Sequence, residues 1–121
     1  MLFFDTYALI EIIEGSPPYQ KYAKEEFITT KYNLMELYYI LLRTLGAKKA
    51  EHYFNTFLPS CVPVEDETLK AAMRFRVVQR KEKNLISYVD CVGYFVALQY
   101  GVRFLTGEKH FKNLQHVEFV P

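Results

Sequence analysis

One acidic residue stands alone in an apolar stretch of the chain. Asp90 is the only Asp, Glu, Lys, Arg or His in residues 84–102. The apolar spacing there predicts a buried helix over about residues 88–100, which places Asp90 in its first turn after a possible N-cap, Ser87. A buried carboxylate needs a cation, a metal ion or several hydrogen bonds as its partner. Asp90 is therefore either a candidate functional acid or a partly exposed capping residue.

Three other acids follow predicted strands. Asp5 directly follows an apolar run, Glu36 lies early in the helix after a second predicted strand, and Glu108 follows a late strand. In open α/β sheets the carboxyl ends of the strands line the ligand crevice, so these acids and Asp90 are expected to converge there. Asp5 has the ordinary alternative of an N-cap.

Four carboxylates within a few ångströms of one another cannot all stay ionised without a counter-charge. A hard divalent cation such as Mg²⁺ or Mn²⁺ supplies that charge and prefers oxygen ligands. The sequence therefore predicts a divalent-cation site. For Glu36 the alternative is a charge arrangement with Arg43, seven residues later at the edge of the core.

The elements that would position these acids alternate between strands and helices. Such alternation predicts an α/β fold with a parallel, doubly wound sheet and right-handed crossovers. We expect one domain over residues 1–121, because this length suits a single core. Pro63 would place its strand at a sheet edge. The predicted strands are residues 1–4, 26–29, 61–64, 102–105 and 117–120.

Composition excludes several classes of protein. A formal net charge of +1 lacks the basic excess of a general nucleic-acid binder, so a polyanion would be held by local patches. No apolar run approaches the ~20 residues of a membrane span, and no signal-peptide pattern opens the chain, so we expect a cytoplasmic protein. Cys61 and Cys91 are expected to be reduced thiols. His52, His110 and His116 lack zinc-ligand spacing.

A cluster of basic residues ends the helix predicted after residue 65. A helix C-terminus favours cations, so a solvated helix end explains the cluster. Contact with a phosphate backbone is the bolder interpretation, and the sequence leaves both open. The basic residues are Arg74, Arg76, Arg80, Lys81 and Lys83.

Four short motifs occur in a characteristic order and together span essentially the whole chain. By these motifs the chain resembles the PIN-domain family of metal-dependent nucleases, which includes the toxins of VapBC toxin-antitoxin pairs. The resemblance implies a three-layer α/β/α sandwich around a five-stranded parallel sheet in the order 3-2-1-4-5. It also implies acids around one or two Mg²⁺ or Mn²⁺ ions and hydrolysis of single-stranded RNA. The motifs are Phe4-Asp5-Thr6, Asn33-Leu34-Met35-Glu36-Leu37, Ser87-Tyr88-Val89-Asp90 and Leu105-Thr106-Gly107-Glu108 with Phe111.

The resemblance also suggests roles for single residues. Asp5 and Asp90 would bind the metal, and Glu36 would ligate it or orient the attacking water. The family usually has Asp where this chain has Glu108, so Glu108 is expected to act outside the first ligands or at a second metal. Supporting roles fall to Thr6, Asn33 and Thr106. Apart from the resemblance, the acids repel phosphate until a metal binds, so weak substrate contacts are expected from flanking cations such as Arg43 and Lys109.

Two other functions are alternatives for the chain, and the nuclease interpretation implies two protein partners. The chain could be a PIN-like binding or regulatory module without catalysis, as the substitution at Glu108 would allow. A phospho-acceptor receiver domain fits poorly, because its acceptor Asp after the middle strand and its Lys near the last strand do not appear at the expected places: the strand at 61–64 leads into a capping cluster, and His116 precedes the last strand. As a toxin, the protein would have a cognate antitoxin and form a homodimer.

Overall fold

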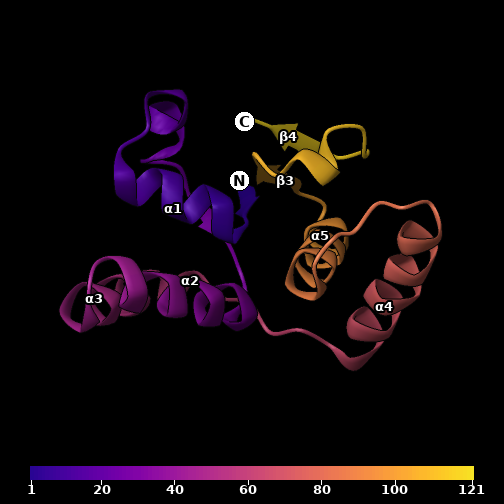
Figure 1. Cartoon of the computed structure of the whole chain (residues 1–121), viewed down its shortest axis with the longest axis horizontal. Helices are drawn as coiled ribbons and strands as arrows, with labels where there is room; N and C mark the ends of the chain where they lie inside the picture. The colour runs from indigo at the N-terminus through magenta and orange to yellow at the C-terminus, as the bar shows by residue number, and fades with distance from the viewer.

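The structure is a computed structural model that describes residues 1–121, with four short strands and five α-helices (Figure 1). Three short 3₁₀ helices, η1 to η3, lie in the connections. The strands are β1 (Leu2–Phe4), β2 (Phe27–Ile28), β3 (Arg103–Thr106) and β4 (Val117–Phe119). The helices are α1 (Thr6–Glu14), η1 (Pro17–Tyr22), α2 (Lys31–Thr44), α3 (Ala47–Phe57), η2 (Leu58–Ser60), α4 (Asp66–Lys81), α5 (Tyr88–Tyr100) and η3 (Lys109–Phe111).

The sheet is parallel throughout, in the order β2-β1-β3-β4. The predicted strand over residues 61–64 is reduced to one parallel bridge between Cys61 and Thr29, outside β2. The N–H of Val62 donates to the carbonyl of Thr29, but the next residue to pair on the β2 side would be Lys31, where α2 begins. A full strand therefore does not form. The sheet therefore has four strands where five were predicted, and the bridge occupies the place of the predicted edge strand.

Helices cover both faces of the sheet. Successive residues of a strand point to opposite faces, and in β1 this sends Phe3 one way and Phe4 the other. Phe3 and Phe104 pack with α4 and α5, whereas Phe4 and Leu105 pack with α1, α2 and α3. In Figure 1, α4 and α5 lie to the right and α1 to α3 to the left. The predicted three-layer α/β/α fold is confirmed.

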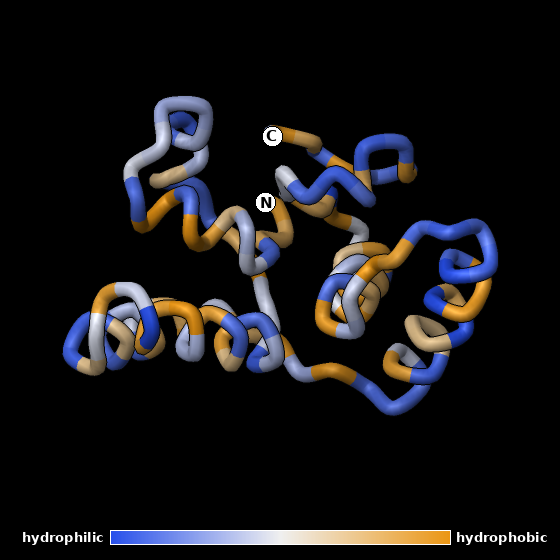
Figure 2. The backbone as a smooth tube through the Cα atoms, viewed as in Figure 1, coloured by the Kyte–Doolittle hydropathy of each residue, from blue (hydrophilic) through white to orange (hydrophobic).

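The largely apolar helix α5 packs closely on the sheet. A Cβ at Gly93 would lie 2.9 Å from the Phe3 ring, so glycine permits this approach. Gly101 ends the helix with a φ of 68°, a left-handed conformation that suits glycine. Figure 2 shows α5 as largely hydrophobic, whereas hydrophilic segments interrupt α4. No helix of the chain is both long and apolar enough to cross a membrane.

Candidate active site

Asp5 lies where β1 passes into α1. Its backbone N–H donates to the carbonyl of Leu105 at 3.3 Å, which joins it to β3. Its carboxylate accepts a hydrogen bond from the N–H of Ala8 at 2.8 Å and so caps α1. The residue is only 1% exposed. The capping role expected for Asp5 is therefore real, but it leaves a carboxylate buried without a cation.

The environment of Asp5 disfavours its charged form. Burial raises the pKa of the Asp5 carboxyl well above its usual value, and the nearby charges of Asp90 and Glu36 raise it further. Hydrogen bonds from the Thr106 hydroxyl and the N–H of Ala8 oppose the shift without cancelling it. Asp5 forms no ion pair, so an external cation would relieve an unfavourable charge here.

A chain of buried hydrogen bonds connects the starts of α1 and α2. The Thr30 hydroxyl donates to Oδ1 of Asn33 at 2.7 Å, and Nδ2 of Asn33 donates to the Thr6 hydroxyl at 3.1 Å. The Thr6 hydroxyl in turn donates to Oε1 of Glu36 at 2.7 Å. Since Thr6, Thr30 and Asn33 are all buried, this network fixes the orientation of Glu36.

Asp90 lies in the first turn of α5, as predicted. Its backbone N–H donates to the Ser87 side chain at 3.1 Å, so Ser87 is the N-cap. Burial raises the pKa of the Asp90 carboxyl to about 7, and the charges of Glu36 and Glu108 add to this. A hydrogen bond from Ser87 and the charge of His110 act in the opposite direction. Asp90 is thus coupled to acids from two other parts of the chain.

Glu108 has a partner that the sequence analysis missed. Its backbone N–H donates to the Thr106 hydroxyl at 2.9 Å, and its carboxylate caps η3 by accepting from the N–H of His110 at 3.2 Å. Nδ1 of His110 also pairs with this carboxylate. The sequence analysis considered His110 only as a zinc ligand; its position two residues after a helix-capping acid was the available signal.

The two predicted substrate contacts differ in position. Lys109 is exposed, directly follows Glu108 and forms no ion pair. Arg43 lies seven residues after Glu36, about 10 Å further along α2, with its guanidinium 5.5 Å from the ring centroid of Tyr39. Lys109 is therefore the neighbour of Glu108, whereas Arg43 lies about two helical turns beyond Glu36.

Of the four acids, two are available to bind a hard cation and two already have partners within the protein. No three acidic, histidine or cysteine side chains form a ready-made metal cage. One oxygen of Glu36 accepts from Thr6, and Glu108 is paired with His110. Asp5 and Asp90 have raised pKa values and no cation, which fits Mg²⁺, an ion that keeps several waters and takes one or two carboxylates.

Comparison with known proteins identifies the family. Residues 2–117 match the PIN domain. The chain therefore belongs to the PIN domain family, a family of nucleases whose members generally use divalent metal ions. A search of curated protein sequences gives no significant match.

Solved structures with the same fold include three proteins of toxin-antitoxin systems. The Mycobacterium tuberculosis toxin VapC20, described as cleaving the sarcin-ricin loop, has a TM-score of 0.79 and 19% identity over 100% of both chains. VapBC2 of Rickettsia felis, bound to a promoter DNA fragment, has a TM-score of 0.74 and 13% identity over 99% of this chain and 98% of that chain. A toxin-antitoxin complex of Klebsiella pneumoniae has a TM-score of 0.71 and 15% identity over 98% and 96%.

Proposed function

We propose that this protein is a metal-dependent endoribonuclease that hydrolyses phosphodiester bonds of single-stranded RNA. The observation that carries the proposal is the group of acids at the carboxyl edge of the sheet, in which buried Asp5 is coupled to Asp90 and no cation of the chain pairs with either. Membership of a nuclease family supports it.

In this proposal Asp5 and Asp90 hold a Mg²⁺ or Mn²⁺ ion. When bound, such an ion activates a water molecule and neutralises charge on the phosphoryl group. Glu36, oriented by Thr6, binds the ion or accepts a hydrogen bond from the attacking water. Thr106 restrains the Asp5 carboxylate through its hydroxyl. Negative charge at the site repels phosphate until a cation is present, so RNA binding there is expected to require the ion.

We further propose that the protein is the toxin of a toxin-antitoxin pair. The three similar structures come from such systems, and one of these proteins is described as a sarcin-ricin loop cleaving toxin. A cognate antitoxin, a homodimer and a cytoplasmic location belong to this proposal. The antitoxin would bury apolar surface and place a basic side chain among the acids, where it would compete with the metal ion.

One observation favours the alternative of a silent PIN-like binding module. Glu108 is paired with His110 rather than free for a metal ion. A silent module would fold normally and bind a protein or RNA partner without cleaving RNA. The two functions therefore differ in a single measurable property, metal-dependent turnover.

Cleavage of a labelled single-stranded RNA in Mn²⁺, in Mg²⁺ and in EDTA tests the proposal. The wild type should cleave with either metal and lose activity in EDTA, and the Asp90→Asn variant, shown by melting to be folded, should be inactive. Asp90→Asn keeps the size of the side chain, so lost activity reports the lost charge. Equal inactivity of two folded proteins in every condition would favour the silent module.

A further inference from the structure

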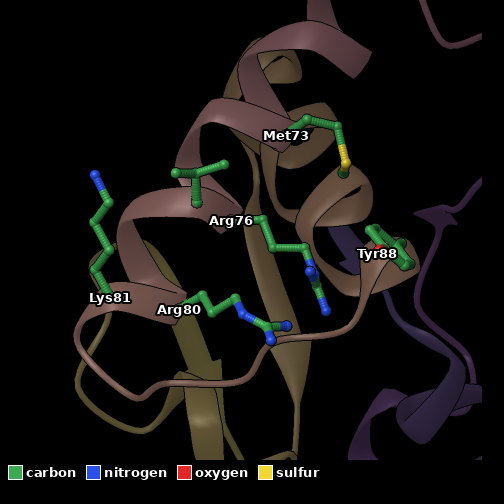
Figure 3. A pocket seen from close by; sticks show the side chains of 6 residues that line it. Met73, Arg76, Arg80, Lys81 and Tyr88 are labelled. Atoms are coloured by element: carbon green, nitrogen blue, oxygen red, sulfur yellow. The ribbon is translucent and has the colours of Figure 1, made fainter.

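A cationic pocket lies between the second half of α4 and the start of α5 (Figure 3). Its volume is about 490 Å³, which falls in the range of small-ligand sites. Three of its six lining residues are basic and one is aromatic. The lining residues are Met73, Arg76, Val77, Arg80, Lys81 and Tyr88.

The pocket lies at the same end of α5 as the acids. The Thr68 hydroxyl, near the start of α4, donates to the side chain of Gln99 near the end of α5. Nε of Arg76, in the second half of α4, donates to the carbonyl of Ile86 just before α5 at 2.9 Å. The two helices therefore run antiparallel, and the basic end of α4 packs beside the turn of α5 that carries Asp90.

The connection between these helices is tied to the candidate active site. Nδ2 of Asn84 donates to the side chain of Gln79 at 2.8 Å and to the backbone carbonyl of His110 at 3.1 Å. His110 is paired with Glu108. These contacts join the loop beside the pocket to the loop that carries Glu108.

The arginines of the pocket lack acidic partners. The ion pairs of the chain are Lys70 with Glu67, Arg103 with Glu118 and His110 with Glu108, so none involves the pocket. Figure 3 shows the guanidinium groups of Arg76 and Arg80 near one another, whereas Lys81 points away from them. Two adjacent guanidinium groups without carboxylates suit a phosphate group, which takes their planar, bidentate hydrogen bonds.

Tyr88 adds an aromatic surface to the same pocket. The Arg76 guanidinium lies 4.0 Å from the centroid of its ring and covers one face. The residue is nevertheless 63% exposed, which leaves its other face open to solvent. Nucleic-acid bases stack on exposed aromatic rings of this kind.

We propose that this pocket binds a nucleotide of the RNA next to the cleaved bond, with Arg80 and Arg76 on its phosphate and Tyr88 stacked on its base. The inference rests on the proposed function, since it assigns a subsite to the same RNA. The pocket combines two arginines that suit a phosphate with an aromatic ring that suits a base. The connection between α4 and α5 links it to the loop that carries Glu108. An acidic protein segment would use the cations but gain little from an open ring face, which is why RNA is the better occupant.

Binding of a labelled single-stranded RNA, followed by fluorescence anisotropy at several salt concentrations, tests this subsite. All proteins carry Asp90→Asn to prevent cleavage, and the buffer contains enough Mn²⁺ to saturate this variant. Arg80→Gln should weaken binding and reduce the slope of log affinity against log salt by about 0.7, the value for one phosphate contact on a single strand. Lys49→Gln removes the same charge from exposed α3, on the opposite side of the molecule in Figure 1, and should change neither.

The ring is tested separately from the charge. Tyr88→Leu should weaken binding at least about fivefold and leave the salt slope unchanged, and Tyr88→Phe, which keeps the ring, should bind as the parent does. Melting curves confirm folding of each variant.

If the wild type cleaves RNA but Arg80→Gln and Tyr88→Leu bind as tightly as the parent, the subsite is wrong and the nuclease function stands. If the wild type neither binds nor cleaves RNA, both proposals fail. If these variants keep RNA binding but lose binding of an antitoxin, the pocket holds a protein segment instead.

Discussion

Replacing Asp90 by asparagine should stabilise the protein when no metal ion is present. Burial and neighbouring acids raise the pKa of Asp90 from its ordinary value of 3.8 to about 7. In the folded protein this carboxyl keeps its proton up to about pH 7, whereas in the unfolded chain it loses the proton near pH 4. The free energy of unfolding of the wild type should therefore fall as the pH rises through this window.

The size of the effect follows from the pKa difference. A pKa difference of this size corresponds to about 4 kcal/mol at pH 8, of which about 3 kcal/mol arises between pH 5 and pH 8. This figure is an upper limit, because Asp90 is only partly shielded from solvent and water screens its charge. Asparagine cannot ionise, so the Asp90→Asn variant should lose its share of the pH dependence. Asp5, whose pKa is raised mainly by burial and then by the charge of Asp90, would retain only part of its own.

Urea unfolding in EDTA at pH 5 and at pH 8 measures the effect. The stability of Asp90→Asn relative to the wild type should increase between these pH values by up to about 3 kcal/mol. Mg²⁺ should narrow this difference at pH 8, since an ion at 100 times its Kd stabilises the wild type by about 2.7 kcal/mol. Glu14→Gln, at an exposed position, is the control. A constant difference between Asp90→Asn and the wild type at both pH values would refute the reasoning.

Three further changes test the surroundings of the acids. Glu36→Gln keeps an acceptor for the Thr6 hydroxyl but removes the charge, so RNA cleavage should fall at least about tenfold with little change in the urea midpoint. Asn33→Ala breaks the buried hydrogen bonds that orient Glu36 and should cost about 1–3 kcal/mol of stability, with cleavage reduced about 10- to 100-fold. Gly107→Ala places a Cβ 2.3 Å from the Tyr7 ring and should cost about 1–3 kcal/mol in urea unfolding. Unchanged cleavage in Glu36→Gln and Asn33→Ala, or unchanged stability in Asn33→Ala and Gly107→Ala, would contradict these assignments.

The positions of the acids were predictable because they depend on topology. Parallel strands share one carboxyl edge, so an acid directly after a strand, such as Asp5, must lie at that edge. Asp90 was predictable for a different reason, since one charge in a strongly apolar helix requires a local partner. Both positions follow from the spacing of apolar residues along the sequence and from the order of the strands and helices.

Other features depended on contacts between segments that are distant in sequence. The hydrogen bond from Thr6 to Glu36 joins residues 30 positions apart, and local spacing carries no information about it. The predicted strand at residues 61–64 had strand-forming residues, but its partner segment passes into α2 at Lys31, and only a single bridge forms. The pocket arises only where α4 and α5 pack together, so the sequence could indicate the basic cluster but not the place of Tyr88 beside it.

Asp5 and Asp90 are proposed to hold one divalent cation together. Calorimetric titration of Mn²⁺ into the metal-free protein at pH 8 tests this proposal most directly, with Asp5→Asn and Asp90→Asn beside the wild type and Glu14→Gln as the control. We expect binding to the wild type and the control, and binding at least about tenfold weaker in each of the two Asp variants. Equal binding by all four proteins, or none by the folded wild type, would contradict the proposal.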